Sequence, residues 1–359
     1  MKKKLAIALS LAMVMSMALT GCGGGASSSQ GASSSQGAAS SQGAASSQPA
    51  ASGDSSQTSS LTPKDGGTRL TFTTGGETGT YYGFGNVIGN KVGDLTSTSV
   101  TTVASGGSAA NIQNMQRGDA QLGFVQSDVM AYAYDGIRSF EETGAVTDFS
   151  TVAALYMEQV QIVTVDPSIK TVADLAGKRV SVGAAGSGVY FNAVDILGAY
   201  DLDIEKDIIP TYQSFGDSAE ALKDGQIDAA FIVAGAPTTA VTDLAAGREI
   251  SLVSLDQEHI DALIEASPYY SPNTISKDVY NTAEDCTTVA VGAVVIARDD
   301  VSEADVYNFL YGTFEDIANL SHGKAAELDL EFATSVTSVG YHPGAVAFFA
   351  DKGIEVPAK

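Results

Sequence analysis

The sequence has few basic residues, cysteines and histidines, and each shortage argues against a class of protein. Among 359 residues, 19 are Lys or Arg and 42 are Asp or Glu, which gives a formal net charge of −23. A surface this acidic repels phosphate backbones, so we expect no nucleic-acid partner. The two cysteines, Cys22 and Cys286, cannot support a disulfide-stapled miniprotein. The length instead allows two medium-sized domains with substantial cores.

Motifs for catalysis and cofactor binding are also missing. The three histidines, His259, His322 and His342, are far apart and form no HExxH or other metal-ligand spacing. No GxSxG elbow occurs, and Cys286 lies in no activating motif. The glycine-rich segment 74–83 completes neither a P-loop nor a dinucleotide fingerprint. We therefore expect a protein that is not an enzyme and that uses no cofactor and no metal.

The first 21 residues have the pattern of an export signal. Three lysines precede the apolar run Leu5–Leu19, which is too short for a permanent membrane span. The run ends in Leu19-Thr20-Gly21-Cys22, which resembles the lipobox of bacterial lipoproteins. An ordinary secretory peptide would instead leave an exposed thiol beside a flexible tail. We expect residues 1–21 to be a lipoprotein signal peptide and a lipid on Cys22 to anchor the protein outside the cytoplasmic membrane.

Residues 22–66 lack the side chains needed to build a core. A six-residue unit occurs four times between Gly25 and Gln48, and Asp54 is the only charged residue between Gly23 and Ser60. Nothing in this stretch offsets the entropy of ordering the backbone. We expect a disordered tether. It either lets the folded body reach a partner in the membrane or serves only to clear the cell wall.

From Thr68 onward, strand-like segments lead through glycine-rich loops into helical patterns. Four such loops occur, at residues 74–83, 105–108, 183–188 and 234–239. Glycine lets a ligand approach the backbone, and the start of a helix offers unpaired N–H donors to an anion. Gln126 also follows a strand-like segment, at the end where ligands bind in open α/β sheets. The pattern predicts an α/β protein with a site for an anion or carboxylate.

Long β-rich segments indicate how the chain divides. Segments 150–155 and 161–165 are candidates for a hinge, and segment 287–297 can carry the chain back to the first half. Two lobes that close on a ligand bury it and exclude water. The predicted limits are 67–166 with 288–359 for lobe I and 167–287 for lobe II.

Seven short motifs occur in order between about residue 68 and residue 359. They are Thr74-Gly75-Gly76 through Gly79-Thr80-Tyr81, Gly106-Gly107-Ser108-x-x-Asn111, Gln126-Ser127-Asp128, Asp174-Leu175-x-Gly177-Lys178, Gly186-Ser187-Gly188, Asp228-Ala229 and His342-Pro343-Gly344-Ala345. Each is weak alone, but in this order they resemble the TAXI solute receptors of TRAP transporters. The resemblance implies a type II periplasmic-binding-protein fold, with two α/β lobes joined by two hinge strands and a ligand between them.

The same resemblance implies a small carboxylate as ligand, such as glutamate, glutamine or a 2-oxoacid. No arginine lies within a glycine-rich loop, although Arg69 or a residue folded from afar could supply a guanidinium clamp. We expect helix-start amides and polar side chains to hold the carboxylate instead. Helix capping by Ser108 and core packing of the tyrosines are equal alternatives. The candidate residues are Gly76, Gly79, Thr80, Tyr81, Ser108, Asn111, Gln126, Tyr156, Ser187, Tyr190, Gly235 and Pro237.

The resemblance also implies a partner, the TRAP membrane permease, and we expect the receptor to be a monomer. A substrate-binding lipoprotein of an ABC importer or a ligand sensor would have the same fold, so the fold cannot distinguish them. A secreted serine hydrolase using Ser187 is a further alternative. The surrounding glycines, Gly186 and Gly188, are explained more simply by the start of a helix.

Overall fold

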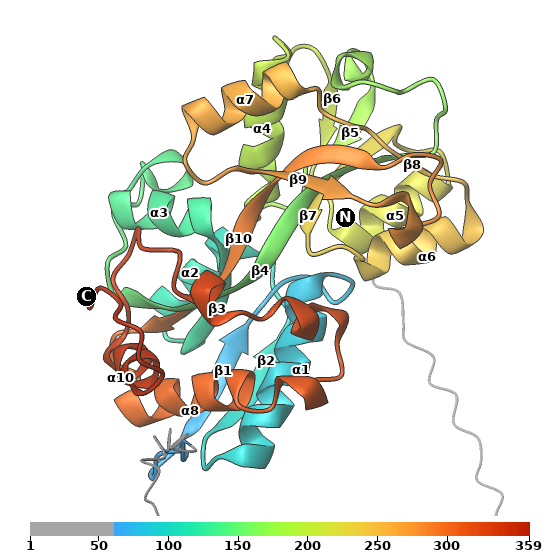
Figure 1. Ribbon diagram of the computed structural model, residues 1–359. Coiled ribbons are helices and arrows are strands. Elements are labelled where there is room, and N and C mark those ends of the chain that lie inside the picture. Colours follow the sequence, from blue (N-terminus) through green and yellow to red (C-terminus); the bar gives the residue numbers. More distant parts are fainter. Residues whose placement is uncertain (1–60) are drawn as a thin grey trace, which may run out of the picture. The chain divides into compact units, whose positions relative to one another are not determined.

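One mixed sheet of ten strands organises residues 61–359, the part of the chain that the computed structural model describes (Figure 1). The predicted signal peptide, the lipid anchor at Cys22 and nearly all of the predicted tether lie outside these residues. The main strand order is β2-β1-β3-β10-β4-β7-β5-β6, with β8 beside β4 and β9 beside β10. The strands are β1 (Arg69–Thr73), β2 (Ser99–Val103), β3 (Leu122–Gln126), β4 (Phe149–Thr164), β5 (Arg179–Ser181), β6 (Ile209–Thr211), β7 (Ala229–Ala234), β8 (Ser251–Leu252), β9 (Ser271–Ile275) and β10 (Cys286–Arg298).

The helices follow the strands in two groups. In lobe I, parallel strands β1, β2 and β3 lead into α1, α2 and α3. In lobe II, parallel strands β5, β6 and β7 lead into α4, α5 and α6. The glycine-rich loops predicted four of these six strand–loop–helix units, the ones that lead into α1, α2, α4 and α6. The helices are α1 (Thr80–Leu95), α2 (Ser108–Gln116), α3 (Ser127–Asp135), α4 (Val189–Ala199), α5 (Phe215–Lys223), α6 (Thr239–Gly247), α7 (Gln257–Ala266), α8 (Glu303–Phe314), α9 (Leu330–Ala333) and α10 (Pro343–Asp351).

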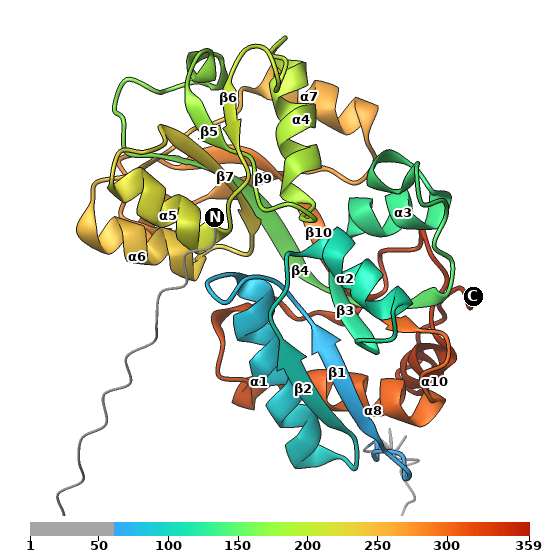
Figure 2. The same ribbon diagram turned by 180° about the vertical axis from the view of Figure 1, so that it is seen from behind.

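Strands β4 and β10 connect the two lobes. They pair antiparallel over most of their length and run from one group of helices to the other (Figures 1 and 2). β4 was predicted as two segments, 150–155 and 161–165, and this was wrong because one strand of 16 residues runs through both. No glycine or proline interrupts it, and the charged Glu158 in its middle is buried rather than part of a turn.

The core alternates between the two faces of the sheet, as the two-residue period of a strand requires. On β10, Val295 joins one cluster of lobe I, whereas its neighbours Val294 and Ile296 join another. On β7, Phe231 and Ile232 enter the two clusters of lobe II in the same way. The predicted two-lobed α/β fold with two connecting strands is therefore confirmed.

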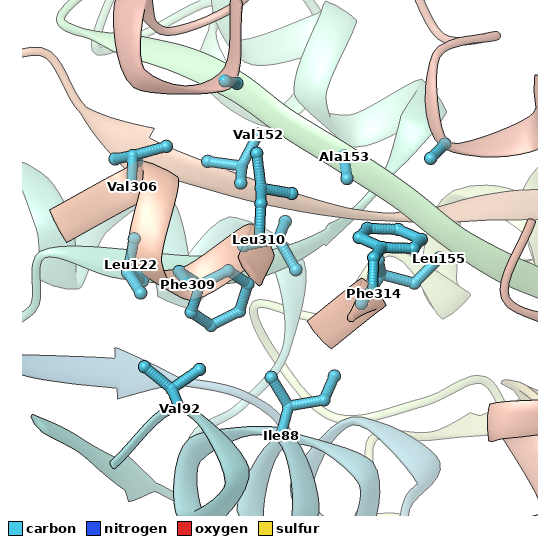
Figure 3. Close-up of a cluster of buried hydrophobic side chains, with 14 of the residues drawn as sticks. Ile88, Val92, Leu122, Val152, Ala153, Leu155, Val306, Phe309, Leu310 and Phe314 are labelled. Carbon is cyan, nitrogen blue, oxygen red and sulfur yellow. The ribbon is translucent and has the colours of Figure 1, made fainter. Parts of the chain in front are cut away.

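The largest cluster holds α1 and α8 against the sheet of lobe I. Figure 3 shows Ile88 and Val92 of α1, Phe309 and Phe314 of α8, and Leu122 of β3 gathered in it. Burying a side chain of this size stabilises a fold by about 1.5–3 kcal/mol. This packing fixes α1, whose first turn borders the cavity described below. Across residues 61–359, none of the helices is both long and apolar enough to cross a membrane.

Two glycines of α1 provide a test of this packing. Gly93 is exposed, and a Cβ there would have no atom within 4 Å, so Gly93→Ala should raise the free energy of unfolding by about 0.5–1 kcal/mol. At Gly89 the added Cβ would lie 3.3 Å from Oγ1 of Thr102 and 3.4 Å from Val100. The gain should therefore shrink or reverse in Gly89→Ala. Urea unfolding of both variants measures the difference, and equal stabilisation would contradict the close packing of α1 on β2.

Candidate functional site

A cavity lies between the lobes, at the carboxyl ends of the parallel strands. It offers about 70 Å³ in which the centre of a water-sized sphere can move, so it suits a small solute. Lobe I supplies Gly75, Gly76, residues 79–81, residues 105–108 and Gln126, and lobe II supplies Ala184, residues 187–189, Ser214, Phe215 and the end of β7. Glu158 of β4 completes the wall. The cavity thus sits beside the strands that join the lobes.

Four helices begin at this cavity, two from each lobe. The N-cap residues of α1, α2, α4 and α5 are Gly79, Gly107, Gly188 and Ser214, and all four line the wall. None of the three glycines gives its helix a side-chain cap, whereas Ser214 accepts a hydrogen bond from the Asp217 amide. The first N–H groups of a helix and the positive end of its dipole favour an anion. Backbone N–H groups from both lobes can therefore donate hydrogen bonds to an anion in the cavity.

The start of α2 requires glycine. Gly107 has a φ of 107°, and a Cβ on it would lie 3.2 Å from the Cα of Ser187 in the other lobe. The Ala110 amide of α2 donates a hydrogen bond of 3.1 Å to the Gly186 carbonyl of lobe II. The two glycine-rich loops consequently meet backbone to backbone at one rim of the cavity.

A second rim joins α1 to lobe II. The Thr80 hydroxyl donates to the Gly235 carbonyl over 2.8 Å, and the Ala240 amide donates to the Thr78 carbonyl over 3.2 Å. Thr80 lines the cavity and is buried. These bonds hold the first turn of α1 against the end of β7.

A third contact is made by side chains of α4. The Asn192 amide accepts a hydrogen bond of 2.7 Å from Gln126 and donates one of 3.1 Å to Asp128. On the same helix Asp195 binds the guanidinium of Arg138, which comes from lobe I, at 2.8 Å. Burial raises the pKa of the Asp128 carboxyl to about 6. The cavity is therefore bordered by contacts between the lobes, as expected of a closed arrangement.

Glu158 carries the most strongly perturbed carboxyl group of the cavity. Its side chain is 2% exposed, and burial raises its pKa to about 8. The Tyr81 hydroxyl donates to Oε2 over 2.6 Å, which lowers the pKa of this carboxyl and offsets part of the burial effect. The Tyr81 ring stacks on Phe124 at 4.5 Å and an angle of 4°. No described residue gives Oε1 of Glu158 a hydrogen bond.

The structure brings seven of the twelve predicted residues to the cavity wall: Gly76, Gly79, Thr80, Tyr81, Ser108, Gln126 and Ser187. Ser108 and Ser187 do not cap their helices. The Ser108 hydroxyl instead accepts a hydrogen bond from the Gln126 amide, and the Ser187 hydroxyl donates one to the Ala184 carbonyl. The alternative that Ser108 serves as a helix cap is therefore wrong.

The other five predicted residues lie outside the wall. Asn111 is buried beneath it, where its side-chain amide donates to the carbonyls of Thr74 and Phe124. Tyr156 is also buried, and its hydroxyl has no partner within the described part of the chain. The remaining three are Tyr190, which lines an outer hollow, Gly235, which accepts from Thr80, and Pro237, which is exposed.

Sequence reasoning missed Glu158, Ser214 and Phe215, although two signals were present. Ser214 is followed three residues later by Asp217, the spacing of an N-terminal capping box. Glu158 lies between two apolar β segments with no glycine or proline to make a turn. A charged residue between two such segments, with no turn residue beside it, indicates one continuous strand that carries the charge in its interior.

Metal and guanidinium ligands are not part of this wall. Within residues 61–359, no group of His, Cys, Asp and Glu is arranged to hold a metal ion. Among the described residues that line the cavity there is no lysine or arginine, and Arg69 lies at another surface. Cys286 is buried, and burial raises the pKa of its thiol to about 11. Electrostatic attraction for an anion must therefore come from the helix ends.

A family model described as the NMT1-like family matches residues 72–353. Among solved structures, the periplasmic aliphatic sulphonate binding protein of Escherichia coli shares 16% identity at a TM-score of 0.41, covering 79% of this chain and 83% of that one. A Salmonella typhimurium periplasmic binding protein with high arginine specificity shares 14% at a TM-score of 0.40, covering 72% and 96%. The GluR0 ligand-binding core of Nostoc punctiforme, in complex with L-glutamate, shares 13% at 0.38, covering 67% and 91%. The ligands named are those of the respective proteins.

The raised pKa of Glu158 predicts how stability depends on pH. The folded protein holds this proton more tightly than the unfolded chain, in which the pKa of Glu158 is near 4.5. Between pH 4.5 and about 8 the unfolded chain loses the proton while the folded protein keeps it, so the free energy of unfolding falls as pH rises. Glu158→Gln keeps an acceptor for Tyr81 without the charge. We expect the variant to match the wild type at pH 4.5 and to exceed it by on the order of 5 kcal/mol at pH 9.

Urea unfolding at a series of pH values measures this difference. The matched control is Glu77→Gln, because Glu77 is exposed in the glycine-rich loop next to the cavity. Its effect should not change with pH. If the free energies of unfolding of Glu158→Gln and the wild type differ by the same amount at every pH, the Glu158 carboxyl group is not buried with its pKa raised.

Proposed function

This chain belongs to the NMT1-like family, and from its cavity we propose that it is an extracytoplasmic receptor that captures a small carboxylate between two lobes. The observation that carries the proposal is the convergence of four helix N-termini, two from each lobe, on one cavity. A carboxylate bound there takes hydrogen bonds from both lobes at once. Binding then favours the closed arrangement, which a partner in the membrane can recognise.

The composition of the wall supports a small, polar ligand. Besides backbone amides, the polar residues Thr80, Ser108 and Gln126 line it, and Phe215 and Val233 give it apolar area. A few placed polar groups in an otherwise apolar pocket are typical of small-molecule sites. We propose that the predicted residues of the wall, together with Ser214, hold the ligand.

We further propose that the receptor delivers its ligand to a TRAP membrane transporter and that a lipid on Cys22 keeps it at the membrane. The ordered motifs that resemble TAXI receptors support this partner, and the sequence around Cys22 supports the anchor. The proposed lobes are residues 67–166 with 288–359 and residues 167–287. With these bounds, the change from lobe I to lobe II falls just after the end of β4, and the return to lobe I falls near the start of β10.

A thermal-shift screen tests the receptor function. Purified full-length protein is heated with amino acids, 2-oxoacids and dicarboxylates, each at several concentrations. A true ligand stabilises the folded state by RT ln(1 + [L]/Kd), about 2.7 kcal/mol at 100 times Kd, which raises Tm by roughly 5 °C. We expect at least one small carboxylate to do so in a dose-dependent way. A folded protein whose Tm none of them shifts would contradict the proposed function.

The ion pair between Arg138 and Asp195 tests closure. Arg138 does not line the cavity, but its guanidinium joins the lobes and lies 4.7 Å from the Tyr132 ring and 5.5 Å from the Phe191 ring. Arg138→Ala removes a contact that only the closed arrangement makes. Because a partly exposed ion pair contributes on the order of 1 kcal/mol, the Kd of a ligand found in the screen should rise about 3- to 10-fold.

Calorimetry measures this Kd, with Arg117→Ala as the control. Arg117 pairs with Asp119 at 2.9 Å on the exposed surface of lobe I and makes no contact with lobe II. Its removal should leave the Kd unchanged. Equal affinities in the wild type and Arg138→Ala would show that closure does not depend on this ion pair.

A further inference from the structure

The cavity contains one acidic group that a simple carboxylate site does not require. Among the described residues of the wall, Glu158 is the only acidic one, and no lysine or arginine accompanies it. A carboxyl group that is 2% exposed is costly to bury unless a charged or hydrogen-bonding partner compensates it. The surroundings of Glu158 therefore indicate what the cavity is built to receive.

The protein satisfies only one oxygen of this carboxyl group. Tyr81 occupies Oε2, while Oε1 has no hydrogen-bond partner among residues 61–359. A bulge in β4 shifts its register with β10, so that Tyr156 lies opposite Ala293 and Glu158 opposite Val291. Residues two apart share a face of a strand, and this places Glu158 on the side of the cavity. The open position at Oε1 is consequently available to a bound solute.

Among residues 61–359, no cation is free to fill that position. The closest candidate is Lys324 in the 3₁₀ segment η5 (Gly323–Glu327), which is buried and lowers the pKa of Glu158. Its ammonium group lies 2.5 Å from Oε1 of Glu327, so it already has its own carboxylate partner. Lys324 also lies outside the cavity wall. A cationic group of a ligand would therefore be the partner that stabilises the ionised form of Glu158.

The cavity thus has two ends of opposite character, the helix N-termini and Glu158. We propose that Glu158 is the specificity-determining residue of this site and that it receives the protonated amine of a solute whose carboxylate the helix N-termini hold. This inference rests on the proposed receptor function and narrows its ligand class to small amino acids and similar zwitterions. The carbonyl of a 2-oxoacid could take only a hydrogen bond from the protonated carboxyl group, without the charge pairing of an ammonium group, and a dicarboxylate would place a second negative charge there.

Calorimetry on the full-length protein tests this with ligand pairs that differ only at the amine. The probes are L-glutamate with 2-oxoglutarate and L-alanine with pyruvate, both at pH 7.5. We expect the amino acid of a pair to bind the wild type at least about tenfold more tightly than its 2-oxoacid. In Glu158→Gln the preference should fall below about threefold, through weaker binding of the amino acid. Glu77→Gln removes the same charge from the neighbouring exposed loop and should keep the wild-type preference.

A proton count gives a second readout that a purely structural role would not change. Glu158 faces Tyr81 of α1, Asp128 of α3 and Lys324 of η5, with Tyr156 beside it on β4. Near neutral pH, burial keeps a proton on the carboxyl group, and an arriving ammonium group displaces that proton to the buffer. Binding heats in phosphate and in Tris should therefore differ for the wild type and agree for Glu158→Gln.

The outcomes separate the two proposals. If both members of a pair bind the wild type equally, or if Glu158→Gln keeps the preference for the amine, the role of Glu158 is wrong and the receptor function stands. If the 2-oxoacids bind more tightly, the same conclusion holds. If neither these pairs nor any compound of the thermal-shift screen binds a folded protein, the receptor function itself is wrong, and the inference fails with it.

Discussion

The pairing of β4 with β10 is the constraint on which the rest of the structure depends. Both strands are buried almost throughout, so their backbone groups need partners, and most find them in the other strand or in β3, β7, β8 and β9. Val160 of β4 and Val289 of β10 already pack in the core of lobe II, whereas Val152 and Val295 pack in that of lobe I. The lobes therefore cannot separate, and their relative motion is limited to bending or twisting this ribbon. The cavity beside the ribbon is lined by both lobes, so such motion changes the contacts across it.

The cavity attracts an anion, whereas the net charge of the whole chain repels one. A net charge of −23 repels an anion at long range, and no described arginine or lysine lines the wall. The attraction is short-ranged because the field of a helix end falls off within its first turn. Glu158 adds a buried carboxyl group that Tyr81 satisfies at one oxygen only. Folding alone thus leaves both ends of the cavity incompletely paired. A solute that pairs them recovers this free energy on binding, which is a useful property for a receptor.

Features set by local pattern could be predicted from the sequence, and features set by tertiary contacts could not. Glycine before an apolar helical spacing located the starts of α1, α2 and α4, because both signals lie within one segment. The facing of Glu158 depends on the bulge in β4, and a one-residue shift reverses which side chains face the cavity. Asn111 is a polar residue near the start of a helix, as a ligand-binding residue would be, but its side-chain amide donates to two backbone carbonyls beneath the wall. Whether Tyr190 reaches the cavity depends on how the lobes meet, which no local pattern encodes.

The contacts between the lobes are few enough for a bound ligand to shift the balance toward the closed arrangement. Beyond the ribbon, they consist of a few hydrogen bonds between loops, the Asn192 network and the partly exposed pair of Arg138 with Asp195. Polar contacts of this kind contribute about 1 kcal/mol each at most once competition from water is counted. Moving a two-state equilibrium from 1:99 to 99:1 takes about 5.5 kcal/mol. Bonds from one solute to helix ends in both lobes can supply such a difference, because an open arrangement makes only half of them. The ligand then acts as the missing part of the interface between the lobes.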